Sequence, residues 1–508
     1  MPSRHLRARI TGLAVFLVSA VLVGCGPEAA VSEAASHDAA REAARREDPR
    51  AADWLAALSG DSATAARRAI REIVEASDTR FVSVLIELLR GAEVGIAGDA
   101  VRVDSAAALE ALTGRSSGTD WPAWVEWYAG TELRSPPGFT GWKGDLLGRV
   151  DEHFSQLLYP GAPSRIRVEE IVWGGVAYDG IPTLDRPDAI PAAEADYLDP
   201  DEPVFGVAWK SEARAYPHRI LDWHEMVNDE LAGVPFSLAY CTLCGAGIAY
   251  RGEASDGRVY AFGSSGLLMR SNKLMVDRQT RSLWNQFTGR PVLGSLVDSE
   301  VRLERLPGVV ATWSDWKRRH PETTVLSLET GHNRPYQLGA AYGSYFAAPD
   351  TMFPVRVRPE LPPKVRVYGI EVDGVPKAYP VEALTRARLI HDEIGDTAVL
   401  LVAGAKEIDV AGQSLRSGRV RYSAGAEVRA YVTHGQRFAL DDQEGTLRDD
   451  IGGTWQVAEE ALVGPAGERF ERLPGVQSYW FGWSAYHPLT LVFREGSPGT
   501  PAASDRPE

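Results

Sequence analysis

The chain has 508 residues, of which 44% are hydrophobic and 24% are charged, and its formal net charge is −15. This length is expected to form about two to four globular domains with real cores, and the acidic surface argues against nucleic acid or anionic lipid as partners. Only three Cys are present, which excludes a scaffold built from disulfides.

The N-terminus has the layout of an export signal. Basic residues precede an apolar run from Leu13 to Val23, which is shorter than the ~20 residues of a spanning helix. The run ends at Gly24-Cys25 and resembles a bacterial lipobox, in which the Cys is acylated and becomes the mature N-terminus. The resemblance predicts a protein anchored to the membrane by a lipid on Cys25 and located outside the cytoplasm. Gly26, where an Asp would favour retention at the inner membrane, favours the outer membrane in a host with two membranes.

The next part of the chain is expected to be helical. Residues 25–50 are rich in Ala, Glu and Arg without an apolar face and are interpreted as a tether. Residues 51–130 carry apolar side chains at spacings of three and four, which predicts short helices resembling a HEAT-like repeat. Repeats of this kind form binding surfaces, so a protein partner is expected here. Residues 131–165 are rich in Gly and Pro and are interpreted as a linker.

The remainder consists of short β-type runs bounded by Gly and Pro, with a few helices. It is internally duplicated: Ala215-Tyr216-Pro217 recurs as Ala378-Tyr379-Pro380, and a Trp-x-x-Trp-x-x-x-His-Pro segment occurs twice, ending at His320-Pro321 and His487-Pro488. The sequence therefore predicts an α+β protein in seven parts. These are a signal peptide (1–24), a tether (25–50), a HEAT-like helical region (51–130), a linker (131–165), a first β-rich repeat (166–340), a second, degenerate repeat (355–495) and a disordered tail (496–508).

The two repeats can be compared with each other. Features kept in both repeats indicate shared fold, and on this ground His320 and His487 are interpreted as structural. Features of the first repeat alone are candidates for function. In the second repeat, Gly404 and Glu407 stand in place of Cys241 and Cys244, Ala387 in place of His224, and Asp442 in place of Arg278, while Asp277 is matched to Asp441. The first repeat also has about five more residues between Gly266 and Asp277, including Met269 and Asn272.

Four segments of the first repeat carry a resemblance to the domain-of-unknown-function family numbered 3179. They are Trp223-His224-Glu225-Met226-Val227-Asn228-Asp229, Tyr240-Cys241-Thr242-Leu243-Cys244-Gly245, Phe262-Gly263-Ser264-Ser265-Gly266 and Asp277-Arg278-Gln279-Thr280-Arg281-Ser282-Leu283-Trp284. The resemblance covers about residues 200–495. Thr242 departs from the Pro expected there, and the resemblance implies no activity.

Phe236 to Tyr240 and Ile248 to Tyr250 read as strands, which places the two Cys in the turn between them. Three interpretations remain open. The pair is a structural disulfide in a non-enzymatic binding or scaffold protein of the envelope. Alternatively, it is a thiol redox site, with Cys241 attacking, Cys244 resolving, His224 as base and Arg278 as the anion-stabilising cation. In the third interpretation, Cys241, Cys244, His224 and Met269 bind a soft metal ion, copper or zinc.

Overall fold

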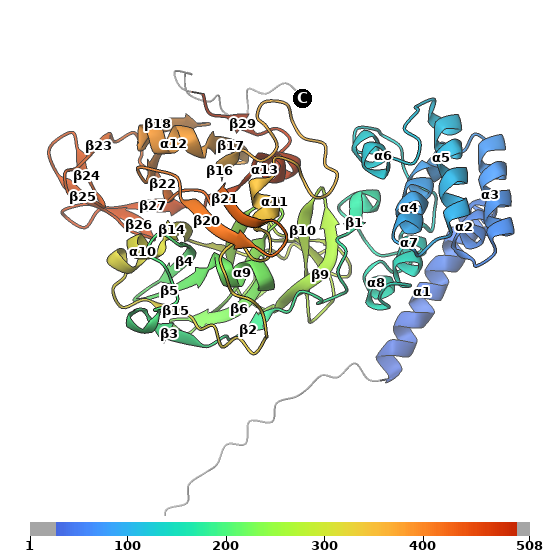
Figure 1. The fold of residues 1–508 in the computed structure, drawn as a ribbon, viewed down its shortest axis with the longest axis horizontal. Coiled ribbons are helices and arrows are strands. Elements are labelled where there is room, and N and C mark those ends of the chain that lie inside the picture. The colour runs from blue at the N-terminus through green and yellow to red at the C-terminus, as the bar shows by residue number, and fades with distance from the viewer. Residues whose placement is uncertain (1–26, 495–508) are drawn as a thin grey trace, which may run out of the picture.

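The computed structural model describes residues 27–494, and it consists of a layer of helices beside a strand-rich body (Figure 1). The predicted α+β class is confirmed. The predicted signal peptide, Cys25 and the predicted tail 496–508 lie outside the described residues. Within residues 27–494, no helix is both long and apolar enough to cross a bilayer.

The helical layer is built from helices with well-defined starts. Asp48 accepts a hydrogen bond from the Ala51 amide at 2.9 Å, and Pro49 opens the first turn of α2; Ser62 caps the next helix in the same way. The elements are α1 (Pro27–Glu47), α2 (Pro49–Ser59), α3 (Ala63–Glu75), the 3₁₀ turn η1 (Thr79–Phe81), α4 (Val82–Glu93), α5 (Asp99–Thr113), α6 (Trp121–Tyr128), α7 (Phe139–Leu147) and α8 (His153–Leu157).

The expected tether and the expected linker both contain helices. Most of the expected tether forms the helix α1. The expected linker 131–165 contains α7 and α8, whose side chains Trp142 and Phe154 are buried in the helical core. Gly141, one of the glycines that made this segment look irregular, is a packing position, because a Cβ on it would lie 2.7 Å from Cγ of Pro160. Glycine therefore marks close contact between α7 and the chain after α8.

The first repeat forms three five-stranded sheets, ordered β14-β4-β5-β15-β3, β13-β8-β7-β6-β2 and β1-β9-β10-β11-β12. Its elements are η2 (Val168–Glu170), β1 (Ile171–Trp173), β2 (Leu184–Asp185), β3 (Ala189–Pro191), η3 (Ala192–Glu194), β4 (Pro203–Trp209), β5 (Glu212–Pro217), α9 (His218–His224), β6 (Met226–Leu231), β7 (Val234–Cys241), β8 (Ala246–Arg251), β9 (Phe262–Met269), β10 (Asn272–Asp277), β11 (Leu283–Asn285), β12 (Arg290–Leu293), β13 (Arg305–Leu306), β14 (Gly308–Thr312), α10 (Trp313–Arg319) and β15 (Thr324–Leu326).

The second repeat follows a connecting segment that contains α11 (Gly343–Ala347). Its sheets are ordered β28-β16-β17-β29 and β18-β19-β22-β27-β26-β25-β24-β23, and a separate hairpin pairs β20 with β21. The elements are β16 (Arg366–Val372), β17 (Val375–Pro380), α12 (Val381–Ala387), β18 (Leu389–Ile394), β19 (Thr397–Ala403), β20 (Asp409–Ser414), β21 (Gly418–Ser423), β22 (Val428–Val432), β23 (Phe438–Leu440), β24 (Thr446–Asp449), β25 (Thr454–Val457), β26 (Ala461–Val463), β27 (Arg469–Leu473), β28 (Val476–Tyr479), α13 (Trp480–Tyr486) and β29 (Leu491–Val492).

Repeated side-chain contacts accompany the repeated sequence. The Tyr216 hydroxyl donates to Asp229 at 2.7 Å, and the Tyr379 hydroxyl donates to Asp392 at the same distance. In both repeats the second Trp of the helical motif packs against the following His, with ring centroids 4.1 Å apart at His320 and 3.9 Å apart at His487. The conserved contacts support a structural role for both histidines.

The residue of the second repeat that corresponds to Asp277 differs between the sequence match and the structure. Asp277 accepts a hydrogen bond from the indole of Trp284 at 2.8 Å, and its counterpart by contacts is Asp449, which accepts from Trp455 at 2.8 Å. Asp441, the residue matched by sequence, instead pairs with an arginine on β24. The β20–β21 hairpin and unequal loops change the offset between the repeats, so the short match of residues 276–279 with residues 440–443 does not fix the register.

The helical layer covers one face of the sheet that contains β9 and β10. Side chains alternate across these strands: Met269 and Leu274 lie in the core shared with the helices, while Leu268 and Met275 lie in the core of the body. At the junction the buried Lys143 ammonium donates to Glu87 at 2.6 Å and to a backbone carbonyl of η2 at 3.2 Å. The hairpin of β9 and β10 is thus held from both sides.

Candidate thiol site

Cys241 and Cys244 lie at the tight turn between β7 and β8, as predicted. Cys241 is the last residue of β7 and pairs with Ala246, the first of β8. The Cys244 amide donates to the Cys241 sulfur at 3.4 Å, and Gly245 closes the turn with φ +61°, a conformation that favours glycine. Both thiols are free, and they are only 2% and 0% exposed.

The two thiols differ in acidity. Burial acts to raise the pKa of Cys241, but hydrogen bonds from the Cys244 thiol and amide outweigh it and leave the pKa of Cys241 below its usual value. Burial, together with the neighbouring Cys241, raises the pKa of Cys244 well above its usual value. Cys241 is therefore the sulfur that ionises first, and Cys244 retains its proton.

A buried ion pair lies beside the turn. Lys273 and Glu225 are 2.8 Å apart, and their side chains are only 4% and 9% exposed. The Thr242 hydroxyl donates to the other oxygen of Glu225 at 2.8 Å, so the residue that departs from the expected Pro satisfies a buried carboxylate. Two charges and a hydroxyl thus lie near Cys241.

Glu225 and Lys273 are presented by strained backbone. Glu225 ends α9 at φ +55°, and Lys273 follows a two-residue hairpin turn in which Arg270 and Ser271 both have positive φ. Such conformations persist where surrounding contacts enforce them. Here Arg270 donates to Glu170 next to the helical layer and to the Ala485 carbonyl of α13 at 2.8 Å.

The second repeat closes over the Cys turn. The Tyr479 amide donates to the Cys244 carbonyl at 2.8 Å, and the Arg366 guanidinium donates to the Gly245 carbonyl at 2.8 Å. A Cβ on Gly482 would lie 2.8 Å from Cβ of Cys244, so the glycine allows α13 to pack directly on the sulfur-bearing residue. The second repeat is therefore part of the site's wall as well as a copy of its fold.

Cys241, Glu225 and Lys273 line one narrow cavity of about 50 Å³. The remaining walls are mainly apolar and include three residues of the connecting segment near α11, namely Tyr342, Met352 and Phe353. The apolar lining residues are Val176, Ile181, Leu243, Leu267, Leu268, Met352 and Phe353. Only a small molecule, or a small part of one, fits beside the Cys241 sulfur.

The other sequence candidates have partners of their own. His224 donates from Nδ1 to the Pro182 carbonyl at 2.8 Å and accepts at Nε2 from the Tyr336 hydroxyl at 2.6 Å. Burial lowers the pKa of His224 to about 4. Arg278 donates to Asp185 at 2.6 Å and to Asp179 at 3.2 Å, and a third of its side chain is exposed. Neither residue lines the cavity beside Cys241.

Met269 lies on the face of β9 opposite to the thiol site, in the core shared with the helices. Among residues 27–494, no group of three or more His, Cys, Asp or Glu side chains is arranged to hold a metal ion. Two thiolates alone do not complete a tetrahedral site. The donor set beside the cavity therefore fits thiol chemistry better than copper or zinc.

A second buried cluster lies behind the turn, on α9. His218 and Asp222 are one helical turn apart and buried, and His218 Nε2 and Asp222 Oδ1 have no hydrogen-bond partner among the described residues. Burial lowers the pKa of His218 to about 3, and burial, opposed in part by the Tyr240 hydroxyl, raises the pKa of Asp222 to about 8. At neutral pH both side chains are thus mainly uncharged.

Sequence reasoning missed Lys273 and Glu225. Two signals were present: Lys273 directly precedes the apolar run Leu274-Met275-Val276 in the segment that only the first repeat has, and Glu225 lies within the quoted Trp-His-Glu motif. A lysine in a buried strand needs a carboxylate partner, which would have directed attention to Glu225.

Comparison with known proteins places most of the strand-rich body in one family. The family model described as "Protein of unknown function (DUF3179)" matches residues 178–490. No curated protein and no solved structure matches the chain.

Proposed function

Because the chain belongs to the DUF3179 family, whose function is unknown, we propose its function from the site: Cys241 and Cys244 form a dithiol that reduces a small peroxide. The observation that carries the proposal is the placement of the more acidic thiol, Cys241, in a cavity of about 50 Å³ beside the Lys273–Glu225 ion pair. The near-complete burial of both sulfurs favours a small substrate over a protein disulfide.

The reaction has two steps. The Cys241 thiolate attacks one oxygen of the peroxide, the O–O bond breaks, and Cys241 becomes a sulfenic acid. The leaving oxygen takes a proton from the Lys273 ammonium and departs as water or an alcohol.

The Cys244 thiol then loses its proton to Lys273 and attacks the Cys241 sulfur, and the S–O bond breaks as the disulfide forms. The leaving oxygen takes that proton from Lys273 and departs as water, and Lys273 regains a proton from the solvent. One peroxide gains two electrons, and two thiols lose them. An external dithiol restores the reduced pair by exchange.

The test uses the purified, reduced protein and one equivalent of hydrogen peroxide. We expect loss of both thiols and a Cys241–Cys244 disulfide by mass spectrometry of alkylated peptides. Cys244→Ser should accumulate a Cys241 sulfenic acid that dimedone traps, whereas Cys241→Ser should not react. Cys25, if acylated, does not contribute a thiol.

A folded Cys244→Ser protein without a sulfenic acid at Cys241 would exclude the proposal. A disulfide that is already closed and resists reduction would instead favour the structural interpretation.

The proposal includes the location of the protein. The signal layout before Cys25 supports a lipid-anchored protein outside the cytoplasm, where peroxides arrive from the surroundings. Cys25→Ser should move the protein from the detergent phase to the aqueous phase in a phase-partition assay, while Cys241→Ser should leave the partition unchanged. Equal partition of the Cys25→Ser and unaltered proteins would refute the anchor.

A further inference from the structure

The duplication gives the thiol site a counterpart in the second repeat. Gly404–Glu407 stands where the first repeat has Cys241–Cys244, and Arg388 stands where it has Glu225; Arg388 even ends its helix at φ +62°, as Glu225 does at φ +55°. In both cases the helix that packs over the turn comes from the other repeat. The helix α10 of the first repeat faces the Gly404–Glu407 turn, and α13 of the second repeat faces the Cys turn.

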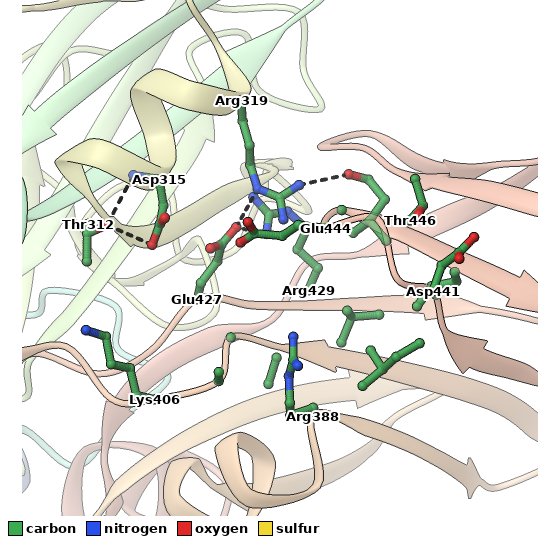
Figure 2. Close-up of a pocket in the computed structure, with 18 of the residues that line it drawn as sticks. Thr312, Asp315, Arg319, Arg388, Lys406, Glu427, Arg429, Asp441, Glu444 and Thr446 are labelled. Atoms are coloured by element: carbon green, nitrogen blue, oxygen red, sulfur yellow. Dashed lines mark hydrogen bonds and ion pairs between the residues drawn. The ribbon is translucent and has the colours of Figure 1, made fainter.

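The counterpart is open where the thiol site is closed. Its cavity has a volume of about 400 Å³, within the range of about 300–1,000 Å³ that is typical of small-molecule sites. One cause is visible on the facing helix, because Asp315 on α10 takes the place of Gly482, which lets α13 pack directly on Cys244. Figure 2 shows Asp315 at the cavity wall, hydrogen-bonded to Thr312.

The carboxylates around this cavity are already partnered. Glu427 pairs with Arg319 at 2.9 Å, and Figure 2 shows the Arg319 side chain reaching from α10 toward Glu427. The other pairs are Asp315–Arg318 at 2.9 Å, Glu444–Arg318 at 2.7 Å and Asp441–Arg448 at 2.8 Å. Glu407 accepts a hydrogen bond from the Ser423 hydroxyl.

Two cations on the opposite wall are not neutralised. Arg388 and Lys406 both line the cavity in the lower part of Figure 2, Arg388 near the centre and Lys406 at the left. Within residues 27–494, neither side chain has a hydrogen bond or an ion pair. Between the cations and the ion pairs the cavity has an apolar floor, formed by Val402, Ala403, Ile408, Leu447 and Val457.

We propose that this cavity binds a small organic acid, whose carboxylate or phosphate pairs with Arg388 and is attracted by the charge of Lys406, and whose apolar body lies on the floor of the cavity. An arginine fork binds such anions with two parallel hydrogen bonds, and a lysine adds a point charge. The duplication has thus produced two sites of different chemistry, one closed around a thiol and one open and lined with cations. This binding function goes beyond the peroxide reaction and does not depend on it.

Calorimetric titration of the whole protein tests the proposal with three probes: benzoate, phenyl phosphate and the neutral benzyl alcohol. We expect saturable binding of at least one anion and none of the alcohol. The double variant Arg388→Ala/Lys406→Ala should weaken anion binding by about tenfold or more, because it removes charge-assisted hydrogen bonds. Arg416→Ala, an exposed arginine in the β20–β21 turn, is the matched control and should bind as the unaltered protein does.

The outcomes distinguish a carboxylic acid from a phosphate ester as the ligand. Binding of benzoate alone assigns a carboxylic acid, binding of phenyl phosphate alone assigns a phosphate ester, and either result supports the site. Absence of binding by both anions at millimolar concentration overturns it, as does anion binding that the double variant leaves unchanged.

Discussion

The buried ion pair beside the Cys turn allows a quantitative prediction. Lys273→Met removes the ammonium that lies 2.8 Å from Glu225 and leaves a carboxylate that is 9% exposed without a counter-charge. Breaking a buried pair in this way costs about 3–5 kcal/mol in the free energy of unfolding. The remaining hydrogen bond from Thr242 offsets only part of this, since one hydrogen bond to a charged group contributes about 1.5–3 kcal/mol.

The assay is a double-mutant cycle on the unfolding transition of the strand-rich body, followed by tryptophan fluorescence in urea. Glu225→Gln combined with Lys273→Met should be more stable than Lys273→Met alone, because no buried charge is left. Arg278→Met is the matched control: its ion pairs with Asp179 and Asp185 are one third to one half exposed, and exposed pairs contribute about 0–1 kcal/mol. A loss below about 1 kcal/mol for Lys273→Met would refute the reasoning, because water would then be screening the pair.

Three further predictions concern the surroundings of the turn. Thr242→Val should destabilise the body by about 1–3 kcal/mol in the same assay, because Glu225 loses a buried donor, and Thr242→Ser should restore most of the loss; equal stability of the Val and Ser variants would contradict this. Gly482→Ala should cost about 1–3 kcal/mol and speed the reaction of Cys244 with an aromatic disulfide, because the new methyl group would push α13 away from the turn; Asp315→Ala, at the counterpart position, should do neither. Asp222 has a pKa raised to about 8 in the folded protein. Between about pH 4 and pH 8 the folded state therefore holds a proton that the unfolded state has lost. The stability that the protonated Asp222 contributes is lost as the pH rises through 8. Since His218, with its pKa near 3, affects stability only below about pH 6.5, Asp222→Asn should remove a fall in melting temperature between about pH 6.5 and 8, and an identical fall in the variant would contradict the assignment.

Local sequence signals predicted the fold class, the duplication and the position of the Cys turn. The turn could be predicted because its cause is local: two β-type runs flank a Cys-x-x-Cys-Gly segment, and Gly245 provides the positive φ. The helices α7 and α8 could not be recognised, because Gly141 is used for close packing, and sequence does not distinguish a packing glycine from a flexible one.

The partners of the turn depend on contacts between distant segments. Lys273 reaches Glu225 only because the β9–β10 hairpin is held between the helical layer and α13. No local pattern encodes that placement. For the same reason His224 and Arg278, chosen because only the first repeat has them, could not be tested for proximity: their partners, Tyr336 and Asp179, lie 112 and 99 residues away in the chain.

The junction between the helices and the body bears on how the chain can be divided. The family match begins at residue 178, after β1, yet β1 pairs with β9 and the helices cover the outer face of the same sheet. A fragment trimmed to the matched residues would lose an edge strand and expose apolar side chains such as Met269 and Leu274 to water, which favours aggregation. The unit that folds on its own is therefore larger than the unit that sequence comparison recognises, and the helices belong to it.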